Sequence, residues 1–512
     1  MEFREKIVFQ IFFTFIIVTA ASLSVFPQNI LTDSRLEKKI LKGLDETFKF
    51  NFDKSEKIFD EIIRKYPDSP VGYHFKSIPY LWRYLDNKND SDLVKFNSLS
   101  DSVLLKTVIS SDNAVNNPFN FYILGSTYSL RAMASASEES YLDVVWSTKK
   151  SYSYMNEVLA IDSTFYDAYL GLGLYNFMVA QTPAALRWAM NIAGISGDAD
   201  TGMEYLRLAV ENGKYSDVEA KYYLSQILIE FYLGYEEADQ ILTGLNKKYP
   251  KNLLFKYSLG LLQLKMKNLD EAEKTFKYVI NSNDSSFIQL IAYSNFSLGN
   301  LHYYKNEFDT AKYFYGNFFT NSSDNYFHGI AALRLGLCYA FTGDSLTAVE
   351  YFKLTDEGNS DIDEDRYAAV KGEEFDDNYP DSLTLKTILI RNLINAGNYA
   401  AASDSLMVLK NELEPEEKIT GEINLMLSDV AFQIDSLTKS FDYALSVIEQ
   451  EETEDWLKPF AYYYAARASF NLGNINEAEE FISEAEDFND YFYENELNNF
   501  LNALSYKIKT SK

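Results

Sequence analysis

The chain has 512 residues, of which 47% are hydrophobic and 16% aromatic, and its formal net charge at pH 7 is −28. One compact core stops growing at roughly 250–300 residues, so this length favours two compact domains or one elongated repeat array. The acidic balance excludes nucleic acid as an expected partner because a phosphate backbone would repel it, and the single cysteine, Cys338, excludes an intramolecular disulfide and a cysteine-based metal cluster.

Residues 1–26 have the pattern of a secretory signal peptide. Arg4 and Lys6 form a short basic stretch, an apolar run follows from Ile7 to about Phe26, and small residues gather after Ala20. The run also approaches the ~20 residues that span a bilayer, so an uncleaved anchor is the alternative. The pattern predicts an exported protein, periplasmic or envelope-associated in a bacterium, with membrane contact only through this segment if it is uncleaved.

An N-terminal repeat array is predicted over residues 36–355, and it is clearest at its centre. There a Leu-Gly pair is followed by an alanine 12 residues after the glycine and by an aromatic residue four positions later. The three sets are Leu259-Gly260, Ala272 and Phe276; Leu298-Gly299, Ala311 and Tyr315; and Leu335-Gly336, Ala348 and Phe352. We expect each glycine to lie where the first helix of a pair touches the second, and each aromatic ring to fill the space between helices.

This spacing resembles the tetratricopeptide repeat. The resemblance implies an all-α fold, an α-solenoid of tetratricopeptide-type helix pairs wound into a right-handed superhelix with an extended concave groove. The copy at Gly43, Ser55 and Phe59 is a weaker match because Lys42 and Ser55 replace the leucine and alanine of the pattern. In the unit that opens at Leu124-Gly125, the second helix is predicted late, near 151–161.

Residues 169–208 read YLGLGLYNFMVAQTPAALRWAMNIAGISGDADTGMEYLRL. This stretch resembles the eukaryotic inclusion-body-clearance family of tetratricopeptide proteins, which carries a similar Gly-x-x-Asn-Phe helix, an apolar insert with proline and a Gly-Asp-x-x-x-Gly turn. The resemblance implies an insert near 181–200, with an apolar part from Ala184 to Ile195, folded against the array. That family is intracellular and lacks a signal peptide, so its cellular role is not carried over.

The C-terminal third is predicted to contain an acidic linker and a second array. Residues 356–381 hold eleven Asp or Glu residues against Arg366 and Lys371, a balance typical of a solvated segment. The turn Asn395 to Tyr399 and the Leu472-Gly473-Asn474 turn repeat the central pattern, so a C-terminal array is expected over 382–505.

Helical phase in the central units predicts which side chains face the groove. This partner-binding set is aromatic and apolar with little charge: Tyr257, Leu261, Lys265, Phe296, Asn300, Tyr303, Tyr304, Leu333 and Leu337. Aromatic anchors with a polar rim suit contacts with a protein or peptide. Because tyrosine is abundant throughout the chain, the same residues could instead be packing residues of the array.

The sequence therefore predicts a protein-binding or assembly scaffold that acts through its groove. The alternative is a carrier of an apolar ligand or lipid that uses the insert near Ala184–Ile195. No metal, cofactor or catalytic residue is expected, since no two of the three histidines stand at metal-ligand spacing and no phosphate-binding loop or nucleophile motif is present.

Overall fold

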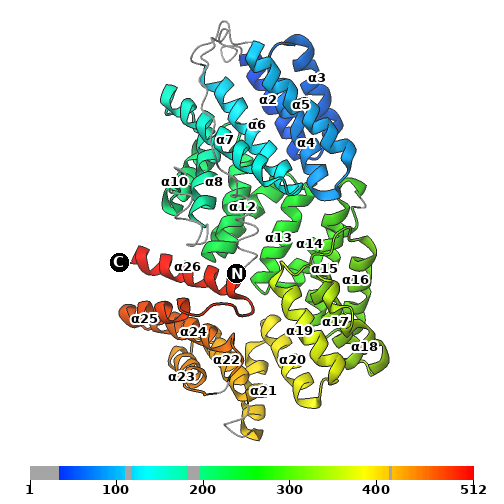
Figure 1. Cartoon of the computed structure of the whole chain (residues 1–512), viewed down its shortest axis with the longest axis vertical. Helices are drawn as coiled ribbons and strands as arrows, with labels where there is room; N and C mark the ends of the chain where they lie inside the picture. The colour runs from blue at the N-terminus through cyan, green and yellow to red at the C-terminus, as the bar shows by residue number, and fades with distance from the viewer. Residues whose placement is uncertain are drawn as a thin grey trace. The chain divides into compact units, whose positions relative to one another are not determined.

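The computed structural model describes residues 34–109, 117–181, 195–282, 284–413, 418–451 and 453–511. Within these ranges the chain is helical almost throughout and contains no strand, which confirms the all-α prediction. The helices belong to two compact units (Figure 1). Unit 1 holds residues up to 226, 239–256 and 284–288, and unit 2 holds 227–238, 257–283 and the chain from 289 onward.

Unit 1 is built from consecutive helices that pack on their sequence neighbours. Its elements are α2 (Ser34–Phe48), α3 (Phe52–Lys65), α4 (Val71–Asn87), α5 (Asp90–Ile109), α6 (Pro118–Ser137), α7 (Tyr141–Ile161), α8 (Ala168–Ala180), α10 (Ala199–Asn212), most of α11 (Asp217–Ile227) and α12 (Tyr235–Lys248), the start of α13 (Leu253–Lys265) and η4 (Ser285–Phe287).

Unit 2 continues the same arrangement to the end of the chain. After η3 (Leu228–Tyr232) and the remainder of α13 come α14 (Leu269–Ile280), α15 (Ile288–Tyr304), α16 (Phe308–Asn321), α17 (His328–Phe341), α18 (Ser345–Phe352), η5 (Thr355–Glu357), α19 (Asp363–Asp377), α20 (Ser382–Asn395), α21 (Tyr399–Glu412), α22 (Lys418–Gln433), α23 (Leu437–Ile448), α24 (Leu457–Asn471), α25 (Ile475–Glu486) and α26 (Glu494–Ser511).

The repeat-defining residues make the contacts that their spacing predicts. A Cβ atom added to Gly299 would lie 2.6 Å from the Tyr315 ring, and one added to Gly336 would lie 2.6 Å from the Phe352 ring. The weaker copy repeats the contact, since a Cβ on Gly43 would lie 2.5 Å from Phe59. The two helices of each pair therefore pack closely because the glycine of the first helix leaves room for the aromatic ring of the second.

The turns inside the pairs share one backbone conformation. Lys267, Asn306, Gly343, Gly397 and Gly473 each follow the first helix of a pair, and each has a positive φ between 58° and 87°. Glycine enters this left-handed region without steric cost, and asparagine tolerates it better than most residues. This turn reverses the chain, so that the second helix packs back against the first.

The structure describes one of two irregular segments predicted in unit 1 and only part of the other. The second helix expected near 151–161 begins ten residues earlier, as α7 starts at Tyr141 directly after α6. The sequence prediction was wrong there because the residues 141–150, which read YLDVVWSTKK, already belong to α7. Most of the insert near 181–200 lies outside the described residues, so its ligand-carrier role stays a prediction.

The structure corrects the prediction of an acidic linker at 356–381. The segment contains η5 and the 15-residue helix α19, which packs against α17 and α18. Asp365 is 1% exposed, and its carboxylate accepts hydrogen bonds from the backbone N–H groups of Ile330 and Asn359, both at 2.9 Å. The boundary between the two units falls within 227–288 instead.

Candidate functional site

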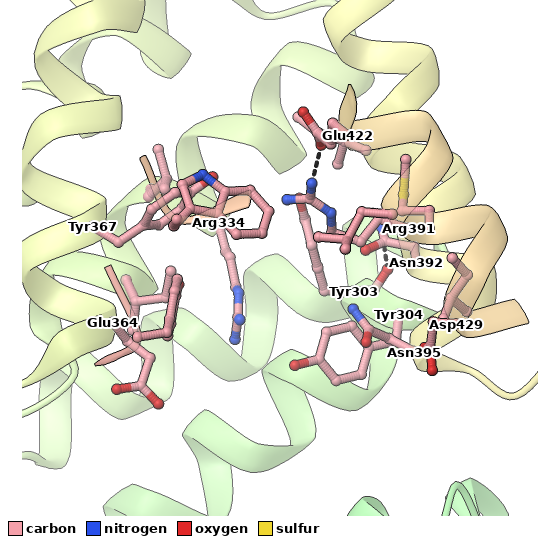
Figure 2. Close-up of a pocket in the computed structure, with 18 of the residues that line it drawn as sticks. Tyr303, Tyr304, Arg334, Glu364, Tyr367, Arg391, Asn392, Asn395, Glu422 and Asp429 are labelled. Carbon is pink, nitrogen blue, oxygen red and sulfur yellow. Dashed lines mark hydrogen bonds and ion pairs between the residues drawn. The ribbon is translucent and has the colours of Figure 1, made fainter. Parts of the chain in front are cut away.

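Unit 2 contains a cavity of about 430 Å3, which we call the inner cavity. The first helices of successive pairs supply most of its wall, together with α19 and α26. Figure 2 shows labelled side chains of the wall from α15, α17, α19, α20 and α22. The lining residues are Tyr303, Tyr304, Ile330, Leu333, Arg334, Leu337, Glu364, Tyr367, Phe375, Ile388, Arg391, Asn392, Ile394, Asn395, Glu422, Leu425, Met426, Asp429, Trp456, Phe460, Tyr464, Tyr493 and Glu496.

Helical periodicity explains how α17 faces the cavity. Ile330, Leu333, Arg334 and Leu337 recur every three or four residues, so they share one face of the helix. Gly336 lies outside this set and instead touches Phe352 of α18. The repeat therefore uses one side of α17 for pairing and leaves another side for the cavity.

Arg334 is the charged residue at the centre of this wall. Its guanidinium lies 5.5 Å from the ring centroid of Tyr304 and 5.9 Å from that of Tyr303, within the range of a cation–π contact. It donates a hydrogen bond to the side-chain oxygen of Asn300, which also accepts one from the Tyr315 hydroxyl at 2.8 Å. Tyr315, whose ring packs against Gly299 in this repeat, thus helps to position Arg334 through Asn300.

The other arginines at or beside the cavity are already neutralised. Arg391 of α20 forms an ion pair with Glu422 of α22. Arg467 of α24 pairs with Asp429 of α22 at 3.0 Å. Within the described part of the chain, Arg334 has no carboxylate within the 4.0 Å of an ion pair.

Three glutamates line the cavity: Glu422 is paired with Arg391, and Glu364 and Glu496 lie on two other helices. Burial raises the pKa of Glu364, and burial together with the neighbouring charge of Glu364 raises the pKa of Glu496 to about 7. Glu496 is exposed, and the surrounding protein still desolvates its carboxyl group. Near neutral pH the two carboxyl groups together therefore carry less than two negative charges.

The last helix closes the wall against the first elements of unit 2. α26 packs on α24, α25 and η3, and the rings of Tyr232 and Tyr506 are 4.7 Å apart. Lys265 pairs with Glu230 of η3 at 3.2 Å. The ring contact between Tyr232 and Tyr506 is therefore one of the contacts that pack α26 against η3.

The predicted groove residues divide into three groups in the structure. Four of them line the inner cavity: Tyr303, Tyr304, Leu333 and Leu337. Asn300 accepts a hydrogen bond from the lining residue Arg334, and Lys265 pairs with Glu230, which does not line the cavity. The remaining three are packed within the array: Phe296 against Tyr315 and Phe318, and Tyr257 and Leu261 against the cluster around Phe276. The partner-binding role of the whole set stays a prediction.

Sequence reasoning missed the charged residues of the cavity. The charged lining residues come from five different helices, and helical phase predicts groove residues only in the central units; they are Arg334, Glu364, Arg391, Glu422, Asp429 and Glu496. One signal was available, because Arg334 is the only arginine or lysine in the otherwise apolar helix α17. A charged side chain in an otherwise apolar first helix indicates a specific contact at that position.

Two classes of site are absent from the described ranges. Their His, Cys, Asp and Glu side chains form no group of three that could hold a metal ion. None of their helices combines the length and apolar character needed to cross a membrane.

Comparison with known proteins places the chain among tetratricopeptide proteins. The family model described as Iml2/Tetratricopeptide repeat protein 39 matches residues 98–384, more than half of the 512 residues. The match includes residues 169–208, and the resemblance predicted from them is confirmed.

Three solved structures are also similar. Pseudomonas aeruginosa pilF is 17% identical over 48% of this chain and 97% of that chain, with a TM-score of 0.34. Yeast Tom70 is 13% identical over 89% and 99%, with a TM-score of 0.32. A tetratricopeptide repeat protein from Parabacteroides merdae is 15% identical over 56% and 98%, with a TM-score of 0.25.

Proposed function

The chain belongs to the Iml2/Tetratricopeptide repeat protein 39 family, and from this premise we propose that it is a protein-binding scaffold whose inner cavity in unit 2 receives side chains of a partner. The observation that carries the proposal is the composition of the cavity. Tyr304, Tyr464 and Trp456 line the same cavity of about 430 Å3 as Arg334. Tyrosine, tryptophan and arginine are the residues that dominate binding energy at protein interfaces.

The way the cavity is assembled supports the same function. Its wall comes from α15, α17, α20, α22 and α24, which are first helices of successive pairs. Solenoid repeats use such stacked surfaces to bind extended partners. The scaffold acts by holding its partner, without catalysis of its own.

A photo-crosslinking experiment tests this proposal. Benzoylphenylalanine would replace Tyr304 in the cavity or Tyr313 on α16, which is 65% exposed and not part of the cavity wall. We expect irradiation of living cells to attach a discrete set of polypeptides to the Tyr304 position and not to the Tyr313 position. Equal crosslinking from both positions, or none from Tyr304, would contradict the proposal.

We also propose that the protein is exported, because residues 1–26 combine a basic start, an apolar run and small residues at its end. The protein then acts in the periplasm or envelope of a bacterium. We expect intact-mass spectrometry of the native protein to give a chain that lacks about 20–28 N-terminal residues. A full-length chain in the membrane fraction would favour the uncleaved anchor, and a full-length chain in the cytoplasm would rule out export.

A further inference from the structure

We propose that the inner cavity binds a neutral sugar ring, which belongs either to a free oligosaccharide or to a glycan on a partner protein. The inference goes beyond the scaffold function and shares with it only the premise that this cavity is a binding site. It stands on the way the wall is held together, on the balance of its charges, and on its aromatic and polar groups.

The cavity is bounded by helices that come from separate parts of the chain. The Asn392 side chain of α20 donates hydrogen bonds to the backbone oxygen of Tyr303 at 2.9 Å and to the side-chain oxygen of Asn306 at 2.8 Å. The C-terminal helix α26, which adds Glu496 to the wall, packs on η3. The volume of about 430 Å3 lies within the range of roughly 300–1,000 Å3 that is usual for small-molecule sites. The cavity therefore suits a compact ligand.

The charges of the wall nearly cancel at neutral pH. Both acidic lining residues of α22 are already paired with arginines. The charged groups that remain in the wall are Arg334, Glu364 and Glu496, and the raised pKa values of the two glutamates reduce their negative charge near pH 7. An anion would meet the glutamates, and a cation would meet the arginine. A neutral ligand avoids both repulsions.

The wall keeps hydrogen-bond donors and acceptors available for a ligand. Among the described residues, the hydroxyl groups of Tyr304 and Tyr464 and the amide of Asn395 have no hydrogen-bond partner. A hydroxyl group donates one hydrogen bond and accepts two, so a ring that carries several hydroxyl groups satisfies donors and acceptors together. An apolar ligand would cover these groups and leave them unpaired, which costs binding energy.

Aromatic side chains supply flat faces for the sugar ring. Trp456, Tyr304 and Tyr367 line the cavity, and Trp456 is the only tryptophan among the lining residues. An aromatic face is electron-rich, so it attracts the weakly positive C–H groups on the face of a sugar ring. The Trp456 indole N–H donates a hydrogen bond to Glu454 at 2.6 Å, which orients the half-buried ring. Figure 2 shows Tyr304, Tyr367 and Arg334 around the same space.

The experiment is a glycan array probed with the full chain, followed by titration calorimetry with the neutral disaccharide that binds best. Two analogues of that disaccharide supply the charge test, one with a hydroxymethyl group oxidised to a carboxylate and one with a hydroxyl group replaced by an amino group. We expect each charged analogue to bind about tenfold more weakly than the neutral sugar, because it meets a like charge in the wall.

Variants of the wall connect the binding to this cavity. Trp456→Leu should weaken binding of the neutral disaccharide about tenfold or more, as for the loss of an aromatic anchor, and Asn395→Ala should weaken it about threefold. Tyr313→Ser, on the exposed side of α16, should leave it unchanged. Thermal unfolding of each variant separates a loss of binding from a loss of fold. Asn395→Ala keeps the test decisive, since it removes no hydrogen bond between described side chains.

The two sources of the sugar give different results. A free oligosaccharide would be recovered by mass spectrometry from the purified natural chain and would be missing from the Trp456→Leu variant. A glycan on a partner would appear on glycopeptides of the co-purifying proteins, and the best disaccharide of the array would elute those proteins from the natural chain.

The inference is overturned if a charged analogue binds as tightly as the neutral sugar, or if the Trp456 and Asn395 variants bind it as the natural chain does. It is also overturned if no glycan binds above the array background. Should polypeptides still crosslink to the Tyr304 position in that case, the scaffold function stands without the sugar. If they do not, both proposals fail.

Discussion

Replacing Gly299 with alanine should lower the free energy of unfolding of unit 2 by about 1–3 kcal/mol, because the added methyl group overpacks the contact between α15 and α16. The new Cβ would lie 2.6 Å from two carbons of the Tyr315 ring. That ring is fully buried, and its hydroxyl is bound to Asn300, so it has little freedom to move aside. Hydrogen–deuterium exchange of the peptides from α15 to α17 would measure the loss.

The next helix offers a matched control for this substitution. Gly316 lies in α16, is exposed, and has nothing within 4 Å of a Cβ added to it. The Gly316→Ala variant should therefore gain about 0.5–1 kcal/mol, since alanine is the better helix former. If both variants were stabilised equally, the glycine of the repeat would not be a contact residue, and the account of helix pairing would be wrong.

Replacing Asp365 with alanine is expected to destabilise the region around α17 and α19 by about 2–4 kcal/mol. The change leaves the N–H groups of Ile330 and Asn359 without their acceptor in a buried place, and each unsatisfied donor costs about 1–3 kcal/mol. Ile330 lies in the first turn of α17, where N–H groups have no partner within the helix. The urea midpoint of the transition followed by circular dichroism would report the change.

Glu373 provides the comparison for Asp365. It lies on the same helix but is exposed, so the Glu373→Ala variant should change stability by no more than about 0.5 kcal/mol. Similar urea midpoints for the two variants would mean that the carboxylate of Asp365 does not hold α17 and α19 together. Residues 356–381 would then be closer to the solvated linker that their charge suggests.

The helix pairs could be predicted from the sequence because their contact is local. Glycine, alanine and an aromatic residue must recur at fixed distances for two adjacent helices to touch, and the spacing of Gly299, Ala311 and Tyr315 records that requirement directly. The left-handed turns at Gly343 and Gly397 leave a similar local trace. These features can be recognised in the sequence without knowledge of the rest of the structure.

The charged part of the cavity could not be predicted in this way. Glu496 reaches Glu364 only because α26 packs on α24 and η3, a contact between residues far apart in the chain. The acidic helix α19 was missed for a related reason. Counting charges treats every carboxylate as solvated, and only the packed structure reveals that Asp365 has two backbone N–H groups to bind.

The central claim is that partner binding depends on the inner cavity of unit 2. Its most direct test is quantitative mass spectrometry of the proteins that co-purify with three forms of the chain. These are the natural chain, a cavity variant (Tyr304→Ser with Arg334→Gln) and a control variant outside the cavity (Tyr313→Ser with Lys274→Gln). We predict that one set of proteins is retained by the natural chain and the control and lost from the cavity variant. A set that is retained by all three, or lost equally from both variants, would contradict the claim.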